Sequence, residues 1–315
     1  MLSDQKPLGS GFGARSTAAD VLKGIDLSGR YAIVTGGASG LGHEAVLALV
    51  RAGAEVLVPA RDPDTARAAF AGVDGVGVAK LDLGDLKSVA AFADAVLAAG
   101  RPVDMLIASA GIMACPETRL GPGWESQFAT NHLGHFALVN ALAPLLVEGG
   151  ARVVMVSSGA HRITGIRWDD LQFEKSYDKW AAYGQSKTAN ALFAVELDRR
   201  GAASGVRAFS LHPGAILTPL QRHLPREEML AAGWIDENGT PAAYFKTVPE
   251  GAATMVWAAT SPQLAGLGGV YCEDCDIAPI GETSGVRPHA TDPGEAERLW
   301  ALSVELTGVE GFAAP

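Results

Sequence analysis

The stretch Tyr31-Ala-Ile-Val-Thr35-Gly-Gly-Ala-Ser-Gly-Leu-Gly42 decides the expected fold of this protein. Five residues typical of a buried strand run directly into a glycine-rich turn, and a stretch of helical period follows from Glu44 to Arg51. Glycines at 36, 40 and 42 allow a tight turn and let backbone N–H groups approach a pyrophosphate at the start of a helix. A strand, a glycine-rich turn and a helix in this order therefore predict a dinucleotide-binding unit.

Apolar runs alternate with helical stretches along the rest of the chain. Near-continuous apolar strands between helices are typical of a parallel sheet covered on both faces, and right-handed crossovers make such a sheet doubly wound. We therefore predict an α/β fold, with a single Rossmann-type doubly wound parallel seven-stranded sheet, in residues 28–315. The six strands after the first are expected at Glu55–Val58, Val76–Lys80, Val103–Ile107, Arg152–Val156, Val206–Leu211 and Gly269–Cys272.

Two segments do not follow this alternation. Residues 1–27 are polar and glycine-rich, so we expect an N-terminal extension outside the core, with a short helix near Thr17 to Lys23. Residues 219–248 are interrupted by proline and glycine, and long connections at the carboxyl edge of such sheets often form lids over substrate. Whether the apolar residues of this expected lid face a pocket or cover the core stays open: Leu220, Leu224, Met229, Leu230, Trp234, Tyr244 and Phe245.

Composition narrows the class of protein. Hydrophobic residues make up 48% of the 315, and the net charge of −10 would repel the phosphate backbone of a nucleic acid. An odd count of three cysteines argues against a disulfide scaffold and fits a reducing cytoplasm. The chain shows no apolar signal segment and no stretch near about eighteen uncharged apolar residues, so we expect a cytoplasmic protein without a membrane span.

Metal binding is not expected. Cys272 and Cys275 have CxxC spacing, but one such pair supplies only two zinc ligands. Four histidines near the expected site form no HExxH or HxxxH pair, and packing or supporting roles are expected for them: His132, His135, His161 and His212.

The end of the second strand bears on the choice of cofactor. Ala60 stands where an acid would bond the ribose 2′-hydroxyl of NAD, and Arg61 can bind a 2′-phosphate through a charge-assisted hydrogen bond. We therefore expect NADP(H), with NAD(H) as the alternative. Asp62 could pair with Arg61 or cap the next helix, and Asp82 could bond adenine or form a turn. Two other cations could meet the phosphate instead: Arg51 and Arg67.

Tyr183 and Lys187 lie four residues apart in a helical stretch, so they share one face of the helix. A nearby ammonium stabilises a phenolate, so we expect Lys187 to lower the pKa of Tyr183 and the pair to perform general acid–base chemistry. Ser157 and Ser158 end the fifth strand, where ligands bind in such sheets, and Asn131 lies in a helical stretch before it. A serine hydroxyl there can polarise a substrate oxygen.

These motifs in this order resemble the short-chain dehydrogenase/reductase family: the loop Thr35–Gly42, Asn131, Ser158, Tyr183-x-x-x-Lys187 and Pro213-Gly214. The resemblance covers roughly Asp26 to Ile280. Three finer motifs resemble the branch of the retinol dehydrogenases and the WW-domain-containing oxidoreductase, which commonly uses NADP: Asn131-His-Leu-Gly-His-Phe136, Tyr183-Gly-Gln-Ser-Lys-Thr-Ala-Asn190 and His212-Pro-Gly214.

The resemblance implies a role for each catalytic residue. Tyr183 would protonate the alkoxide as hydride arrives, and Lys187 would tune Tyr183 and hold the nicotinamide ribose. Ser158, 25 residues before the tyrosine as in the branch, would orient the carbonyl, while Asn131 would anchor a proton-relay water and Thr218 would bond the carboxamide. The full cofactor-binding set expected is Gly36, Ser39, Gly40, Leu41, Gly42, Arg61, Asp82, Leu83, Ser109, Ala110, Gly111, Tyr183, Lys187, Pro213, Gly214, Ile216 and Thr218.

One motif departs from the family pattern. The family usually has Asn-Asn-Ala-Gly after the fourth strand, whereas this chain has Ala108-Ser109-Ala110-Gly111, and we expect Ser109 to replace some of the lost hydrogen bonding.

The predicted function is NADP(H)-dependent hydride transfer between nicotinamide and a small-molecule carbonyl or alcohol, such as a hydrophobic or aromatic ketone, aldehyde or secondary alcohol. The alternatives are an NAD(H)-dependent alcohol dehydrogenase and a non-catalytic NADP-sensing or scaffold protein. A Ser-His-Asp hydrolase is disfavoured because Ser158 lacks a G-x-S-x-G context. Members of the family are often homodimers or homotetramers through the helix that carries the tyrosine.

Overall fold

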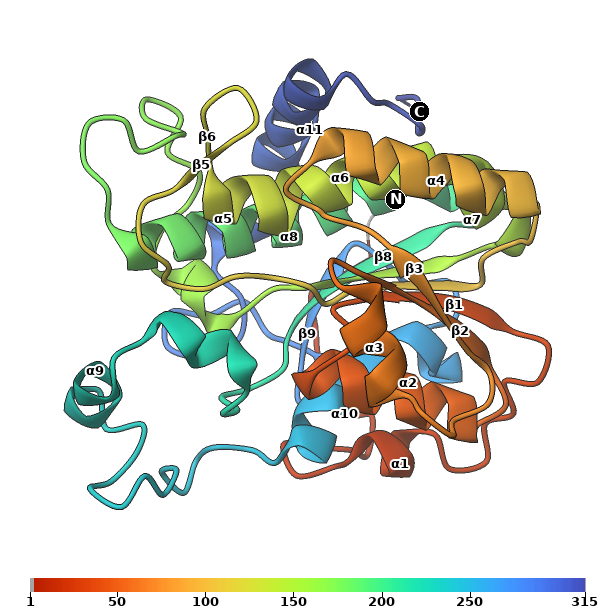
Figure 1. Ribbon diagram of the computed structural model, residues 1–315, viewed down its shortest axis with the longest axis horizontal. Helices are drawn as coiled ribbons and strands as arrows, with labels where there is room; N and C mark the ends of the chain where they lie inside the picture. The colour runs from red at the N-terminus through yellow and green to blue at the C-terminus, as the bar shows by residue number, and fades with distance from the viewer. Residues whose placement is uncertain (1–2, 315) are drawn as a thin grey trace.

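The computed structural model describes residues 3–314, so residues 1 and 2 of the expected extension and residue 315 lie outside the described range. Its centre is an eight-stranded sheet in the order β10-β9-β8-β7-β4-β1-β2-β3 (Figure 1). The strands are β1 (Tyr31–Thr35), β2 (Glu55–Ala60), β3 (Val76–Lys80), β4 (Met105–Ala108), β7 (Arg152–Val156), β8 (Arg207–His212), β9 (Val270–Glu273) and β10 (Asp276–Ile277). A separate pair consists of β5 (Arg119–Leu120) and β6 (Trp124–Glu125).

The seven predicted strands are all present and pair in parallel, which confirms the doubly wound α/β class. The predicted count of seven was one too low, because β10 adds an antiparallel strand beside β9. Asp274 and Cys275 turn the chain between them, with φ of 53° and 60°. Two residues are too few to leave a periodic pattern in the sequence, so β10 was not predicted.

Helices cover both faces of the sheet (Figure 1). On one face lie α1 (Ala18–Val21), α2 (Gly40–Arg51), α3 (Pro63–Ala69) and α10 (Val248–Thr260). On the other lie α4 (Leu86–Ala99), α5 (Ser126–Phe128), α6 (Gly134–Ala141), α7 (Ala143–Gly149), α8 (Lys179–Gly201) and α11 (Pro293–Thr307). Successive strand residues alternate between the two cores, since Ala32 and Val34 pack with α2 and α10 while Ile33 packs with α4 and α6.

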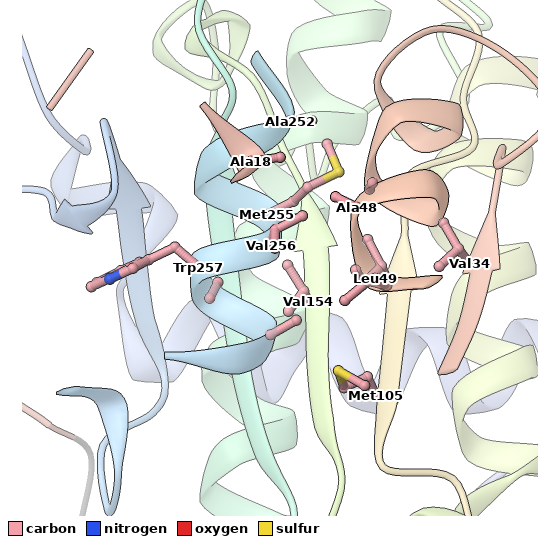
Figure 2. Packing of buried hydrophobic residues seen from close by; sticks show 14 of the residues in the cluster. Ala18, Val34, Ala48, Leu49, Met105, Val154, Ala252, Met255, Val256 and Trp257 are labelled. Atoms are coloured by element: carbon pink, nitrogen blue, oxygen red, sulfur yellow. The ribbon is translucent and has the colours of Figure 1, made fainter. Parts of the chain in front are cut away.

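The helix α1 of the N-terminal segment packs into the core, which corrects the expectation for that helix, whereas residues 3–16 before it are exposed or half-buried apart from Ser10. Thr17 caps α1 in a reciprocal capping box with Asp20, as the predicted short helix requires. Ala18 and Val21 of α1 are buried against α10, and Figure 2 shows Ala18 beside Ala252. The polar composition of the segment hid this packing because a one-turn helix needs only two or three small apolar residues to cover its neighbour.

The helix α8 is interior rather than exposed. Every residue from Ala182 to Asp198 is buried. On its outer side Trp300 of α11 stacks on Phe193, with ring centroids 5.6 Å apart, and the guanidinium of Arg200 lies 4.6 Å from the Trp300 ring. The helix α11 therefore covers part of α8.

The segment 219–248 leaves the sheet beyond β8 and returns at α10 (Figure 1). It contains a 3-10 turn at Pro219–His223, the short helix α9 (Arg226–Ala231) and a bridge between Ile235 and Pro241. Within residues 3–314, no helix combines the length and the apolar character that crossing a membrane requires.

Candidate active site

A cleft of about 1490 Å³ opens at the carboxyl ends of the central strands. It lies where the strand order reverses, because β1 pairs with β2 on one side and with β4 on the other. Ligands bind at this position in open α/β sheets. All seventeen residues expected to bind cofactor line the cleft, and so does Ser158.

The glycine-rich loop after β1 is packed too closely for side chains at two of its glycines. Gly36 has φ of +68°, and a Cβ there would lie 2.8 Å from the backbone nitrogen of Ala110. A Cβ on Gly42 would lie 2.4 Å from the carbonyl oxygen of Gly36, and Gly40 has φ of +56°. Any side chain at these positions would fill the cradle or strain the backbone, so the N-terminus of α2 can present its N–H groups to a pyrophosphate.

Asp62 caps the next helix, which decides between the two roles considered for it. Its Oδ1 accepts hydrogen bonds from the backbone nitrogens of Asp64 and Thr65 at 3.1 and 3.2 Å. The side-chain hydrogen bond from Thr65 lowers the pKa of Asp62 further. The carboxylate is therefore engaged in capping α3, although Asp62 also lines the cleft.

The three candidate phosphate partners differ in what they already bind. Arg67 pairs with Asp64 at 2.7 Å, and Arg51 approaches Glu44 at 4.0 Å. Arg61 forms no ion pair within residues 3–314, lies exposed at the end of β2 and lines the cleft. Its charge is therefore available to a ligand.

Asp82 forms a turn while facing the cleft. Its Oδ1 accepts a hydrogen bond from the backbone nitrogen of Gly84 at 2.9 Å. The turn-forming alternative is therefore realised. Asp82 also lies in the cleft wall, so the same residue can still contact an adenine base.

Tyr183 and Lys187 meet Ser158 at one side of the cleft. Tyr183 and Lys187 are 4% and 5% exposed, and both project from α8. The Nζ of Lys187 donates to the carbonyl oxygen of Val156 at 2.8 Å, so the last residue of β7 holds the ammonium in place. A phenol, a hydroxyl and an ammonium are thus gathered from a helix and a strand end.

Burial shifts both titrating groups. It raises the pKa of Tyr183 to about 12, and the side-chain hydrogen bond with Ser158 opposes this rise. The expectation that Lys187 brings this pKa below its ordinary value is therefore wrong for this structure, because loss of hydration outweighs the effect of neighbouring groups. Burial also lowers the pKa of Lys187 to about 8. At neutral pH the phenol keeps its proton, which is the form that a proton donor needs.

The two serines at the end of β7 have different surroundings. Ser158 caps the 3-10 turn Gly159–Arg162, and its Oγ accepts from the backbone nitrogen of Ala160 at 3.2 Å. The Oγ of Ser157 donates to the backbone carbonyl of Lys187 at 2.7 Å and is committed to holding α8. The hydroxyl of Ser158, beside Tyr183, is the one suited to a substrate oxygen.

Asn131 lies behind the cleft wall instead of in it. It occupies a π-helical turn, Ala129–Leu133, and its amide exchanges two hydrogen bonds of 2.9 Å with the backbone of Ile112. Its Nδ2 also donates to Ser186 Oγ at 2.9 Å. Asn131 therefore joins the loop after β4 to the helix of Tyr183, and π-helical turns of this kind are frequent at functional sites.

The loop after β4 is held by residues that the sequence did not reveal. The backbone nitrogen of Ala110 donates to Thr35 Oγ1 at 3.1 Å, and Thr35 Oγ1 lies 2.8 Å from His135 Nε2. His135 Nδ1 donates in turn to the carbonyl oxygen of Asn131 at 2.9 Å. Ser109, the expected replacement, forms no side-chain hydrogen bond among the described residues. The spacing of His135 one helical turn after Asn131 was the signal for this chain of bonds.

Burial lowers the pKa of all four histidines near the site, so each is neutral at pH 7. Each also has a structural hydrogen bond, such as that between His132 Nε2 and Ser303 Oγ at 2.8 Å. Within residues 3–314, no group of three or more His, Cys, Asp or Glu side chains is placed to hold a metal ion.

The segment 219–248 forms one wall of the cleft. Of the seven large apolar residues considered for the lid, Leu220, Leu224, Met229, Trp234 and Phe245 line the cleft, whereas Leu230 and Tyr244 lie outside it.

The cleft wall also includes residues outside the expected cofactor-binding set and lid, among them Met113, Cys115 and Trp180. Trp180 precedes Tyr183 by three residues on α8, so helical spacing could have found it. Its ring lies 6.4 Å from that of Tyr183, and its Nε1 donates to Glu228 of α9 at 2.9 Å. Glu228 thereby joins the lid to the helix that carries the tyrosine.

Comparison with known proteins agrees with this arrangement. A model of the family described as short chain dehydrogenase matches residues 30–229. A probable oxidoreductase of Streptomyces lividans is 50% identical over 296 residues, covering 89% of this chain and 98% of that protein. Retinol dehydrogenase 12 of Homo sapiens is 38% identical over 292 residues, covering 90% and 88%. A crystal structure of an uncharacterised protein from Mycobacterium paratuberculosis has a TM-score of 0.73 at 36% identity, covering 95% and 100%.

The chain therefore belongs to the short-chain dehydrogenase/reductase family and is an oxidoreductase of that family. This confirms the resemblance that the sequence motifs carry.

Proposed function

We propose that this protein transfers a hydride between NADP(H) and the carbon of a hydrophobic carbonyl or alcohol. The observation that carries the proposal is the meeting of Ser158, Tyr183 and Lys187 in the same cleft as the glycine-rich loop. A sensing or scaffold protein would need the loop, but it has no use for a phenol and an ammonium buried side by side, since burial of the lysine charge is unfavourable.

The bound nicotinamide would supply or accept the hydride. In the reductive direction, the hydroxyl of Ser158 donates a hydrogen bond to the substrate oxygen, and the hydroxyl of Tyr183 gives that oxygen its proton. Lys187 keeps a positive charge beside the phenolate that Tyr183 becomes and offers its remaining N–H groups to the ribose. Asn131 and His135 keep the loop after β4 against the helix of Tyr183.

Three features favour NADP(H) over NAD(H). Ala60 supplies no carboxylate for a 2′-hydroxyl, Asp62 is engaged in capping α3, and Arg61 stands at the cleft without an ion-pair partner among the described residues. A guanidinium there can bind a 2′-phosphate with charge-assisted hydrogen bonds.

The substrate end of the cleft favours an apolar or aromatic ketone, aldehyde or secondary alcohol. Its walls are thioether, thiol, aliphatic and indole groups, and Trp180 and Trp234 meet at 5.9 Å in a T-shaped contact. One relative is named retinol dehydrogenase 12, and retinol is an apolar alcohol. The three cysteines are free and buried, which is in keeping with a reducing cytoplasm.

The experiment that tests the proposal is a titration of the purified protein with NADPH and NADH, followed by a turnover assay with aliphatic and aromatic carbonyls. We expect tighter binding of NADPH and its oxidation by a hydrophobic carbonyl. Tight binding with no turnover across a broad panel would instead favour the sensing or scaffold function, and equal affinity for both cofactors would remove the NADP preference.

A further inference from the structure

We infer that the N-terminal segment contributes to the substrate site. Arg15 is a positioning residue that holds in place the part of the segment 219–248 that contains Phe245. The inference rests on the proposed function, because it takes the wall formed by the segment 219–248 as the substrate end of the cleft.

The helix α1 places Arg15 at a fixed point. Ala18 and Val21 are buried against α10, as Figure 2 shows for Ala18, and Thr17 caps the helix. Before α1, the backbone nitrogen of Ser16 donates to the carbonyl oxygen of Gly13 at 3.0 Å. Arg15 therefore leaves a turn that is attached to the core, although its own side chain is 56% exposed.

The guanidinium of Arg15 binds the carboxyl-terminal end of the segment 219–248. Its NH1 donates to the carbonyl oxygen of Phe245 at 3.0 Å, and its NH2 donates to that of Ala243 at 2.9 Å. Within residues 3–314, Arg15 is the one donor to these two oxygens. NH1 also lies 3.3 Å from Glu250 Oε2, and Glu250 accepts from the backbone nitrogen of Thr247 in the capping box of α10. The planar guanidinium of Arg15 thus connects the loop that contains Ala243 and Phe245 to the N-terminal end of α10.

The loop held by Arg15 is connected to the catalytic tyrosine through aromatic contacts. Phe245 is buried and lines the cleft, and its ring lies 6.2 Å from that of Trp234. Trp234 lies 5.9 Å from Trp180, which lies 6.4 Å from Tyr183. Because each contact is edge to face, a shift of the loop would open the wall against which a substrate packs beside Tyr183.

The consequence concerns substrate selection. Arg15 touches neither the glycine-rich loop nor Arg61, so its loss should leave the cofactor half of the cleft unchanged. A large aromatic carbonyl needs the whole wall to be held near Tyr183, whereas a small aliphatic carbonyl contacts little of it. The ratio of kcat/KM between large and small carbonyls should therefore depend on Arg15, mainly through KM.

The test compares Arg15→Ala and Arg15→Lys with a matched control, Lys6→Ala. Lys6 belongs to the same segment, is strongly exposed and pairs only with Asp4 among the described residues. For Arg15→Ala we expect the large-to-small ratio of kcat/KM to fall about tenfold, which corresponds to the loss of about 1.4 kcal/mol. NADPH affinity should stay within about twofold and amide hydrogen exchange should rise in residues 242–246. Arg15→Lys should recover part of the ratio, because one ammonium cannot span both carbonyls.

An unchanged ratio in Arg15→Ala would overturn the inference, even with faster exchange in the lid, and so would an equal fall in Lys6→Ala. A wild-type protein that turns over no carbonyl is a failure of the proposed function alone. In that case hydrogen exchange decides the inference: faster exchange in residues 242–246 of Arg15→Ala supports the positioning role, and unchanged exchange overturns it.

Discussion

The ammonium nitrogen of Lys187 lies 5.6 Å from the centre of the Tyr183 ring, one turn earlier on the same helix. The carbonyl oxygen of Val156 fixes that nitrogen from the end of β7. The spacing of Tyr183 and Lys187 on α8 and the end of β7 thus fix the position of the ammonium beside the phenol.

Tyr183→Phe removes the proton donor while it preserves the ring. We expect kcat to fall about 10²–10⁴-fold, because general acid catalysis contributes on this scale, and NADPH affinity to change little. Steady-state kinetics and a binding titration check this. Tyr31→Phe, at the far end of β1, is the control and should behave as wild type. Retained turnover in Tyr183→Phe would remove Tyr183 as the acid.

Ser158→Ala and Ser157→Ala separate the two serines. The first should lower kcat about 100-fold, since it removes a donor aimed at the developing negative charge. The second should lower the free energy of unfolding by about 1 kcal/mol through loss of the hydrogen bond to the carbonyl of Lys187, with a much smaller effect on kcat. Kinetics and chemical denaturation measured on both variants decide the matter, and a larger kcat loss in Ser157→Ala would reverse the assignment.

Arg61→Ala should weaken NADP(H) binding about 10–100-fold and NAD(H) binding hardly at all, because a charge-assisted hydrogen bond contributes about 1.5–3 kcal/mol. Calorimetric titration with both cofactors measures this. Arg67→Ala is the matched control, since Arg67 already pairs with Asp64. An equal loss for both cofactors in Arg61→Ala would contradict recognition of the 2′-phosphate.

Lys187→Met should lose turnover and gain free energy of unfolding, and the size of this gain should depend on pH. Burial lowers the pKa of Lys187 from 10.5 to about 8, so between these values the unfolded chain holds a proton that the folded protein has lost. The free energy of unfolding of the wild type therefore rises with pH across this window, whereas the variant has no such group.

At neutral pH we accordingly expect Lys187→Met to be more stable by up to about 3 kcal/mol, with an advantage that shrinks above pH 8 and disappears near pH 10.5. Denaturation of both proteins from neutral to alkaline pH measures this difference, and turnover should be lost in the variant throughout. An advantage that is constant with pH would contradict burial as the cause of the shifted pKa.

Much of the fold could be predicted because its signals are local. Strand-length apolar runs, helical periods and the glycines at 36, 40 and 42 each lie within a few neighbouring residues, and together they place Tyr183 and Lys187 on one helix. The one-turn helix near Thr17 was predicted from its sequence, but its burial was not, since that depends on α10, more than two hundred residues away.

The sequence by itself determined the class of fold, the position of the glycine-rich loop and the placement of the candidate acid–base pair Tyr183 and Lys187 on one helix, since periodicity and residue chemistry carry these. Tertiary structure alone decided that burial raises the pKa of Tyr183, that Thr35 and His135 hold the loop after β4, and that Arg15 reaches the carbonyl of Phe245. The physical reason is that desolvation and contacts between distant residues arise only when the chain folds, and no local pattern encodes which distant groups will meet.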